Sequence, residues 1–258
     1  MTAAAQPLRS PGGSFGSVLP RGPKVANLLA HQIIDEILSS GLPEGSPLPP
    51  EREMATVYGV GRSTVREALR ILENLGAVSI RAGRNGGPIV RRPRARDLSG
   101  PLTLMFQFEQ ASMLDVLRAR QVLEPSLSRL AAEHATKEQI DEMRDSVARI
   151  RRDPEDHAEY VRQNERFHNL VGEASESPIL RLYSGSLQSI ADGGMVGFRY
   201  AAKQRLATAD FHLEITEKIS VGDPEGAHQS MADHLVEAGN FWQHRHPEGV
   251  TRPIRWLE

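Results

Sequence analysis

One helical turn of this sequence carries an unusual concentration of groups that can bind nucleic acid. The segment GVGRSTVREALRILENLG, residues 59–76, places two hydroxyl side chains and two arginines between a glycine-containing turn and an apolar-periodic run. They are Arg62, Ser63, Thr64 and Arg66. Arginine can bond guanine bidentately, and hydroxyls and backbone N–H groups at a helix start can hold phosphates. The segment therefore predicts a helix that enters the DNA major groove by its N-terminus.

A second set of residues has the chemistry of a metal site. Asn164 and His168 lie four residues apart, on one face of an expected helix, and His212 and His234 fall on two later helices. If these helices pack together, the side chains can converge in the core, where neutral imidazoles bind zinc or a similar divalent ion. The alternative is that they are ordinary surface or core histidines.

The remaining histidines carry no such pattern, and we interpret them as surface or packing residues. They are His31, His134, His157, His228, His244 and His246.

The helices and strands that would position Arg62 to Arg66 are all expected in the N-terminal part of the chain. Three apolar-periodic helical segments lead to residue 76, with Val65, Leu69, Leu72 and Leu75 on one stripe of the third. The period then changes, and AVSIRA, a glycine-rich tip and PIVRR predict a two-stranded hairpin. This order is the outline of a winged helix-turn-helix.

Other arginines lie where such a domain meets DNA. Arg52, on the preceding helix, can reach a flanking phosphate. Arg81 and Arg84, at and near the hairpin tip, can reach the backbone or the minor groove. For any single arginine the alternative is a solvated helix face, but the turn, the basic helix start and the basic wing together favour DNA.

The rest of the chain predicts helices alone. Helical patterns cover residues 101–110, 113–134, 137–151, 154–174, 178–200, 204–220 and 224–245. Three of these helices are expected to begin at Pro154, Pro178 and Pro224, each after an Asp or Ser cap, and Thr136 with Gln139 forms a capping box. The fold class is therefore mainly α, with a small β-hairpin wing followed by an all-helical bundle of six or seven helices.

Five segments follow from this pattern. We expect a disordered tail over residues 1–23, the winged helix-turn-helix domain over 24–93, a linker over 94–100, the all-helical domain over 101–245 and a C-terminal tail over 246–258.

Charge divides the chain in the same way. Residues 1–96 hold 13 Lys and Arg against 7 Asp and Glu, whereas residues 97–258 hold 18 against 26. Only the N-terminal part is therefore expected to face a polyanion. The sequence has no cysteine, no apolar run long enough to span a bilayer and no signal-peptide pattern, so we expect a cytoplasmic protein without membrane contact.

The stretch LPPEREMATVYGVGRSTVREALRILENLGAVSIRAGRNGG closely resembles the N-terminal domain of GntR-family transcriptional regulators. The resemblance covers roughly residues 24–93. It implies that the five residues Arg52, Arg62, Ser63, Thr64 and Arg66 contact DNA, and that Gly83 forms the wing tip. Two departures stand out: Gly61 replaces the usual Ser or Thr before the recognition helix, and Pro50 replaces the usual Ser. We expect a slightly weaker helix start or one lost phosphate contact.

The second half resembles the FadR-type effector-binding domain, FCD, through DVLRARQVLEPSLSRLAAEHAT, NERFHNLVGEASESPIL and FHLEITEKISVGDPEGAHQSMADHL. This looser resemblance covers roughly residues 101–245. It implies a metal ion, zinc first with nickel or manganese as alternatives, held by Asn164, His168, His212 and His234. Asp is commoner at the first of these positions, and Asn keeps an oxygen ligand but removes a charge.

Arg120 and Glu124 match the Arg-x-x-x-Glu of the same family. One interpretation is an ion pair on a helix surface, worth a few tenths of a kcal/mol. The other interpretation places both residues at the effector site. Arg120 would bind a carboxylate of the effector, and other oxygens of the effector would bind the metal.

Together the resemblances imply a ligand-responsive transcriptional regulator of the FadR subfamily. We expect it to be a repressor that binds a palindromic double-stranded DNA operator as a homodimer and responds to a small carboxylate effector. Two alternatives remain: a metal-dependent hydrolase using the three histidines, and a DNA-binding dimer with neither metal nor effector. The hydrolase lacks a carboxylate placed as in HExxH, because Glu165 points to another helix face than His168.

Overall fold

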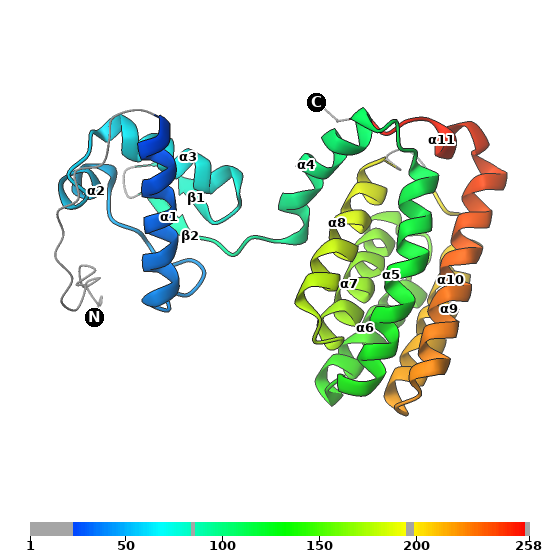
Figure 1. Ribbon diagram of the computed structural model, residues 1–258. Coiled ribbons are helices and arrows are strands. Elements are labelled where there is room, and N and C mark those ends of the chain that lie inside the picture. Colours follow the sequence, from blue (N-terminus) through cyan, green and yellow to red (C-terminus); the bar gives the residue numbers. More distant parts are fainter. Residues whose placement is uncertain (1–22, 84–85, 195–198, 256–258) are drawn as a thin grey trace. The chain divides into compact units, whose positions relative to one another are not determined.

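The computed structural model describes residues 23–83, 86–194 and 199–255. Its contacts divide the chain into two compact units, Met1–Asp97 and Leu98–Glu258. The expected fold class is confirmed: the first unit combines helices with a two-stranded wing, and the second is built from helices (Figure 1). Nearly all of the expected N-terminal tail, residues 1–22, lies outside the described residues.

The first unit has the element order of a winged helix-turn-helix. Its helices and strands are α1 (Pro23–Ser39), α2 (Glu51–Val57), α3 (Arg62–Asn74), β1 (Val78–Arg81) and β2 (Gly87–Val90). The strands pair antiparallel with Val78 opposite Val90 and Arg81 opposite Gly87. The segment before α2 extends this pairing through a bridge from Pro47 to Ile89.

The core of this unit comes from one apolar face of each helix. Leu29 and Ile33 of α1 pack with Met54 of α2 and with the stripe Val65 and Leu69 of α3, all almost fully buried. Such a stripe recurs every three to four residues because the helix completes a turn in that interval.

Leu75 was expected on the same stripe, but it is 61% exposed. It is the C-cap of α3, and the chain there leaves the helix through Gly76, whose φ is +73°. The backbone therefore turns away before Leu75 can reach the core.

The turn after α3 is held from outside by Asp97. A Cβ atom at Gly76 would lie 2.5 Å from Oδ2 of Asp97. That carboxylate accepts hydrogen bonds from the guanidinium of Arg91 at 2.8 and 3.0 Å and from the backbone N–H of Arg94 at 2.7 Å. Glycine is thus required at position 76 both by its backbone angle and by this close approach.

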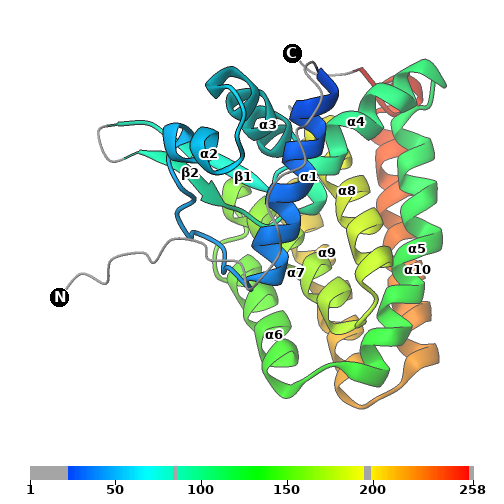
Figure 2. The same ribbon diagram turned by 60° about the vertical axis from the view of Figure 1, so that its left-hand side comes forward.

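The second unit is a bundle whose main helices run side by side (Figures 1 and 2). The helices are α4 (Ala95–Phe108), α5 (Met113–His134), α6 (Lys137–Arg152), α7 (His157–Ala174), α8 (Pro178–Gly194), α9 (Ala202–Ser220), α10 (Pro224–Arg245) and α11 (Pro247–Thr251). Helix α5 contacts α7, α8, α9 and α10, so it forms the centre of the bundle. Residues 95–100 of the expected linker are part of α4.

Side-chain caps fix where several of these helices begin. Thr136 and Gln139 form the expected capping box, and Asp223 caps α10 with Pro224 at its start. The start expected at Pro154 is wrong, because Asp156 accepts a hydrogen bond from the N–H of Glu159 and α7 begins at His157. A second Asp three residues along therefore provides the cap in place of Asp153.

Residues 246–255, the described part of the expected C-terminal tail, instead pack on the bundle. Residues 247–251 form α11, and Val250 and Ile254 are buried in a cluster with Met113 and Trp242. The N–H of Ile254 also donates to the carbonyl of Ala111. The apolar spacing of Val250 and Ile254 makes this segment part of the core.

Within the described ranges, none of the helices combines the length and apolar character needed to cross a bilayer.

Candidate functional site

The N-terminal turn of α3 presents the side chains expected to read DNA. Arg62, Ser63 and Arg66 are exposed, and Thr64 is half-buried. The N-cap is Gly61, which offers no side-chain acceptor to the first-turn N–H groups. The positive end of this helix is therefore open to a phosphate oxygen, in line with the weaker cap expected from Gly61.

Arg66 is oriented by a neighbour that the sequence did not single out. Its Nε and Nη2 atoms donate to the two carboxylate oxygens of Glu51, at 3.3 and 2.8 Å. The hydrogen bond from Arg66 lowers the pKa of Glu51, which keeps this carboxylate charged. Arg66 is thus held in one orientation across α2 and α3, and part of its charge is already paired.

The remaining DNA-facing candidates lie on α2 and on the wing. Arg52 is exposed on α2, and Arg81 ends β1, also exposed. Gly83 follows at the wing with a φ of +111°, a conformation that favours glycine. Arg84 lies outside the described residues.

Three histidines from three helices converge inside the second unit. His168 lies on α7, His212 on α9 and His234 on α10, and their candidate ligand nitrogens lie within 4.8 Å of one another. All three are buried. The ring of His212 also stacks on Phe167 with centroids 3.8 Å apart, which fixes its plane.

Burial keeps the imidazoles of His212 and His234 uncharged, so each ring has one nitrogen with a free lone pair. Burial, with smaller contributions from His234 and His168, lowers the pKa of His212 well below its usual value. Burial likewise lowers the pKa of His234 to about 3. Neither ring nitrogen of His212 has a hydrogen-bond partner in the part of the chain that the structure describes. Uncharged imidazoles with unused lone pairs are the donors a divalent metal ion requires.

His168 is held by a buried carboxylate. Its Nδ1 lies 2.6 Å from Oε2 of Glu124. With the proton on Nδ1, the lone pair on Nε2 is free to bind a metal ion. A carboxylate next to the other ring nitrogen commonly orients a metal-binding histidine in this way. The three-histidine set therefore fits a divalent ion.

Arg120 and Glu124 form a buried pair, which excludes the surface interpretation. Arg120 Nε lies 2.6 Å from Glu124 Oε1, and the side chains are 8% and 3% exposed. Burial would raise the pKa of Glu124, but the charge of Arg120 and the contacts with Arg120 and His168 outweigh it and hold the pKa well below the usual range. Glu124 thus accepts a hydrogen bond from Arg120 through Oε1 and lies against His168 through Oε2, and it is not among the residues that line the cavity.

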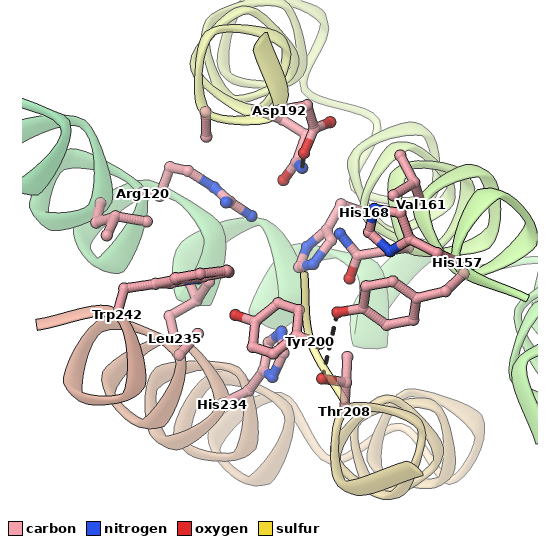
Figure 3. A pocket seen from close by; sticks show the side chains of 16 residues that line it. Arg120, His157, Val161, His168, Asp192, Tyr200, Thr208, His234, Leu235 and Trp242 are labelled. Carbon is pink, nitrogen blue, oxygen red and sulfur yellow. Dashed lines mark hydrogen bonds between the residues drawn. The ribbon is translucent and has the colours of Figure 1, made fainter. Parts of the chain in front are cut away.

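A cavity of about 340 Å³ adjoins this cluster (Figure 3). Arg120, Asn164, His168 and His234 line it, whereas His212 is fully buried and is not among the lining residues. The cavity also has polar and aromatic walls that the sequence interpretation missed: His157, Tyr160, Gln188, Asp192, Tyr200, Thr208 and Trp242. A small molecule that enters can thus meet Arg120 and two of the three histidines.

The sequence spacing of some of these residues could have identified them as lining the cavity. Tyr160, Asn164 and His168 are spaced by four residues, so extending the stripe by one turn reaches Tyr160. His157, interpreted as an ordinary histidine, lies one turn further along the same face and lines the cavity.

The family of the chain follows from both units. Residues 26–85 match the gntR family of bacterial regulatory proteins, and residues 115–237 match the FCD domain. The chain is a GntR-family transcriptional regulator with an FCD domain. Members of this family are transcription regulators and not enzymes, so the hydrolase alternative is set aside.

Relatives support the assignment along most of the chain. The HTH-type transcriptional repressor NanR of Cronobacter sakazakii is 28% identical over 245 residues, which covers 89% of this chain and 91% of that protein. NanR of Escherichia coli K12 is 29% identical over 224 residues, covering 85% of this chain and 84% of its own length. The solved structure of Streptococcus agalactiae GntR has a TM-score of 0.58 at 24% identity and covers 83% of this chain and 99% of that one, in agreement with the fold.

Proposed function

We propose that this GntR regulator is a repressor of the FadR subfamily that binds a palindromic operator as a homodimer and is released by a small carboxylate effector. The observation that carries the effector part is the cavity between the three-histidine cluster and the buried Arg120. A metal ion and a guanidinium on one small cavity form a receptor for an anion.

At the operator, the first turn of α3 would read bases and phosphates. Arg62 is exposed at the helix start, with no salt bridge among the described residues, so its guanidinium is free to bond a guanine. Arg52 and the wing residue Arg81 would hold the flanking backbone. A dimer of such domains reads two half-sites, which gives the palindrome.

In the second unit, His168, His212 and His234 would hold the metal, with the amide oxygen of Asn164 as a fourth donor. When bound, a divalent ion supplies a Lewis-acidic centre that attracts an anionic oxygen. The residues of the chain do the rest: Arg120 binds the carboxylate of the effector, while Glu124 keeps Arg120 and His168 in place. Asn164 in place of Asp removes one negative charge from the site, so the net charge is one unit more positive and favours an anionic ligand.

Release from the operator would require that the effector prefer the conformation that binds DNA poorly. An effector with equal affinity for both conformations shifts nothing, however tightly it binds.

The test combines metal analysis with operator binding. Untagged protein, purified without chelator, is examined by elemental analysis and native mass spectrometry beside His168→Ala, and beside His228→Ala as a control on α10 outside the cluster. We expect one ion per chain in the wild type and control, and loss of the ion in His168→Ala. Fluorescence anisotropy with an operator from the promoter region of the chain's own gene then follows displacement by a panel of small acids.

If the wild type binds no zinc, nickel or manganese, the metal part of the proposal fails. If no acid alters operator affinity, the effector part fails, and the alternative of a DNA-binding dimer without metal or effector gains support.

A further inference from the structure

The carboxylate and metal sites proposed above do not use the wall of the cavity that α8 contributes. Gln188 and Asp192 lie one helical turn apart on α8, and both line the cavity. Gln188 is 3% exposed. Its Nε2 donates to Oδ1 of Asp192 at 2.7 Å, so the two side chains are fixed relative to each other. Figure 3 shows Asp192 projecting into the same space as Arg120 and His168.

This wall presents hydrogen-bond acceptors. Oε1 of Gln188 is buried and has no partner among the described residues. A carboxylate accepts several hydrogen bonds, and one bond from Gln188 leaves Asp192 with capacity for more. A buried acceptor without a partner costs free energy, which a ligand that brings a donor would recover.

The charge of Asp192 reinforces this argument. Burial raises the pKa of Asp192, because the charged carboxylate is poorly solvated there. A donor on the ligand would relieve this cost, whereas a second carboxylate on the ligand would bring like charges together. An alkyl chain would leave both acceptors unsatisfied.

We propose that Gln188 and Asp192 form a second subsite that recognises hydrogen-bond donors, so that the effector is an acid that also carries hydroxyl or amino groups. The inference rests on the proposed effector role of the cavity. The carboxylate of such an acid faces Arg120, and its donor groups face α8. Simple alkyl acids and dicarboxylates of equal length are discriminated against.

Matched pairs of acids test the subsite directly. The probes are glycerate against propionate, gluconate against hexanoate, and 4-aminobutyrate against butyrate, with glutarate as the dicarboxylate. Affinity for the full-length, metal-loaded protein is measured by titration calorimetry. We expect the donor-bearing acid to bind at least tenfold more tightly in one or more pairs, and the winning pair tells hydroxyl from amino recognition.

Two variants locate the preference, and the chain provides a matched control. Asp192→Asn keeps the side-chain volume and an acceptor for Gln188 but removes the charge, and Gln188→Leu removes the unpartnered oxygen. Each should reduce the preference for the donor-bearing acid at least fivefold. Gln229 and Asp233 form the same Gln-to-Asp hydrogen bond, at 2.9 Å, on the exposed face of α10, so Asp233→Asn should change nothing.

The outcomes separate the two proposals. If both members of every pair bind equally, or the alkyl acid or glutarate binds best, the donor subsite is overturned while the carboxylate site stands. If the preference persists in both variants, it does not come from α8, and the subsite is again overturned. If no acid of any pair binds the wild type, the proposed effector role fails and this inference fails with it. Should a variant not fold, the wild-type preference decides.

Discussion

Substitution of Glu124 by Gln tests whether the buried network supports the bundle. The change removes the negative charge that lies 2.6 Å from Arg120 Nε and 2.6 Å from His168 Nδ1. At an effective dielectric constant of about 20, the attraction to Arg120 alone is about 6 kcal/mol. The variant no longer has to bury a carboxylate, which offsets part of this loss. We therefore expect a net destabilisation of about 3–5 kcal/mol, as found when one partner of a buried pair is removed.

The assay is calorimetric unfolding of the metal-free protein. For a unit of this size, a loss of this magnitude lowers the melting temperature of the second unit by about 6–20 °C. Glu248→Gln, which breaks the exposed pair with Arg252, is the control and should melt with the wild type.

A double variant distinguishes the charge imbalance from lost packing. Arg120→Met with Glu124→Leu removes both charges and replaces them with apolar volume, so it should recover most of the stability lost in Glu124→Gln. Two results would refute the reasoning that an unpaired buried charge causes the loss of stability. One is a Glu124→Gln variant that melts at the wild-type temperature, and the other is a double variant that melts at a lower temperature than Glu124→Gln.

Three further results are expected. Arg62→Ala should weaken specific operator binding by about 1–3 kcal/mol and relax preference at one base pair in a binding-selection assay; an equal loss on all sequences would make Arg62 a phosphate contact. Gly76→Ala should destabilise the first unit by more than 1 kcal/mol in urea unfolding, because φ is +73° and the new Cβ would meet Asp97; wild-type stability would contradict the close approach. Removal of the metal with a chelator should lower the melting temperature of the wild type but not of His168→Ala, and an equal shift in both would contradict binding at the cluster.

Much of the first unit could be predicted from the sequence because its signals are local. The apolar stripe of α3 and the glycine turn after it depend only on helical period and backbone freedom, and they lie where expected apart from Leu75. The start of α7 was predicted too early because, from the sequence alone, Asp153 and Asp156 are equally good capping residues. The structure shows that Asp156 accepts the capping hydrogen bond from the N–H of Glu159. Local signals therefore fix element type more firmly than element ends.

The cavity was only partly predictable because it depends on how helices distant in sequence pack. Spacing and resemblance together selected His168, His212 and His234 from nine histidines. No such signal marks Gln188 and Asp192, since the same spacing in Gln229 and Asp233 belongs to a solvent-exposed face. Only the packing of α8 against α5 and α7 tells a cavity wall from a surface pair.

The place of Trp242 gives the protein an optical reporter of its own. Its indole lines the cavity, with Tyr200 4.5 Å away between ring centroids, and the sequence contains one other tryptophan, Trp256, outside the described residues. Indole emission responds to the polarity and the quenching groups around the ring. Occupation of the cavity should therefore be visible as a change in intrinsic fluorescence, without a label and without DNA, and Trp256→Phe would isolate the signal of Trp242.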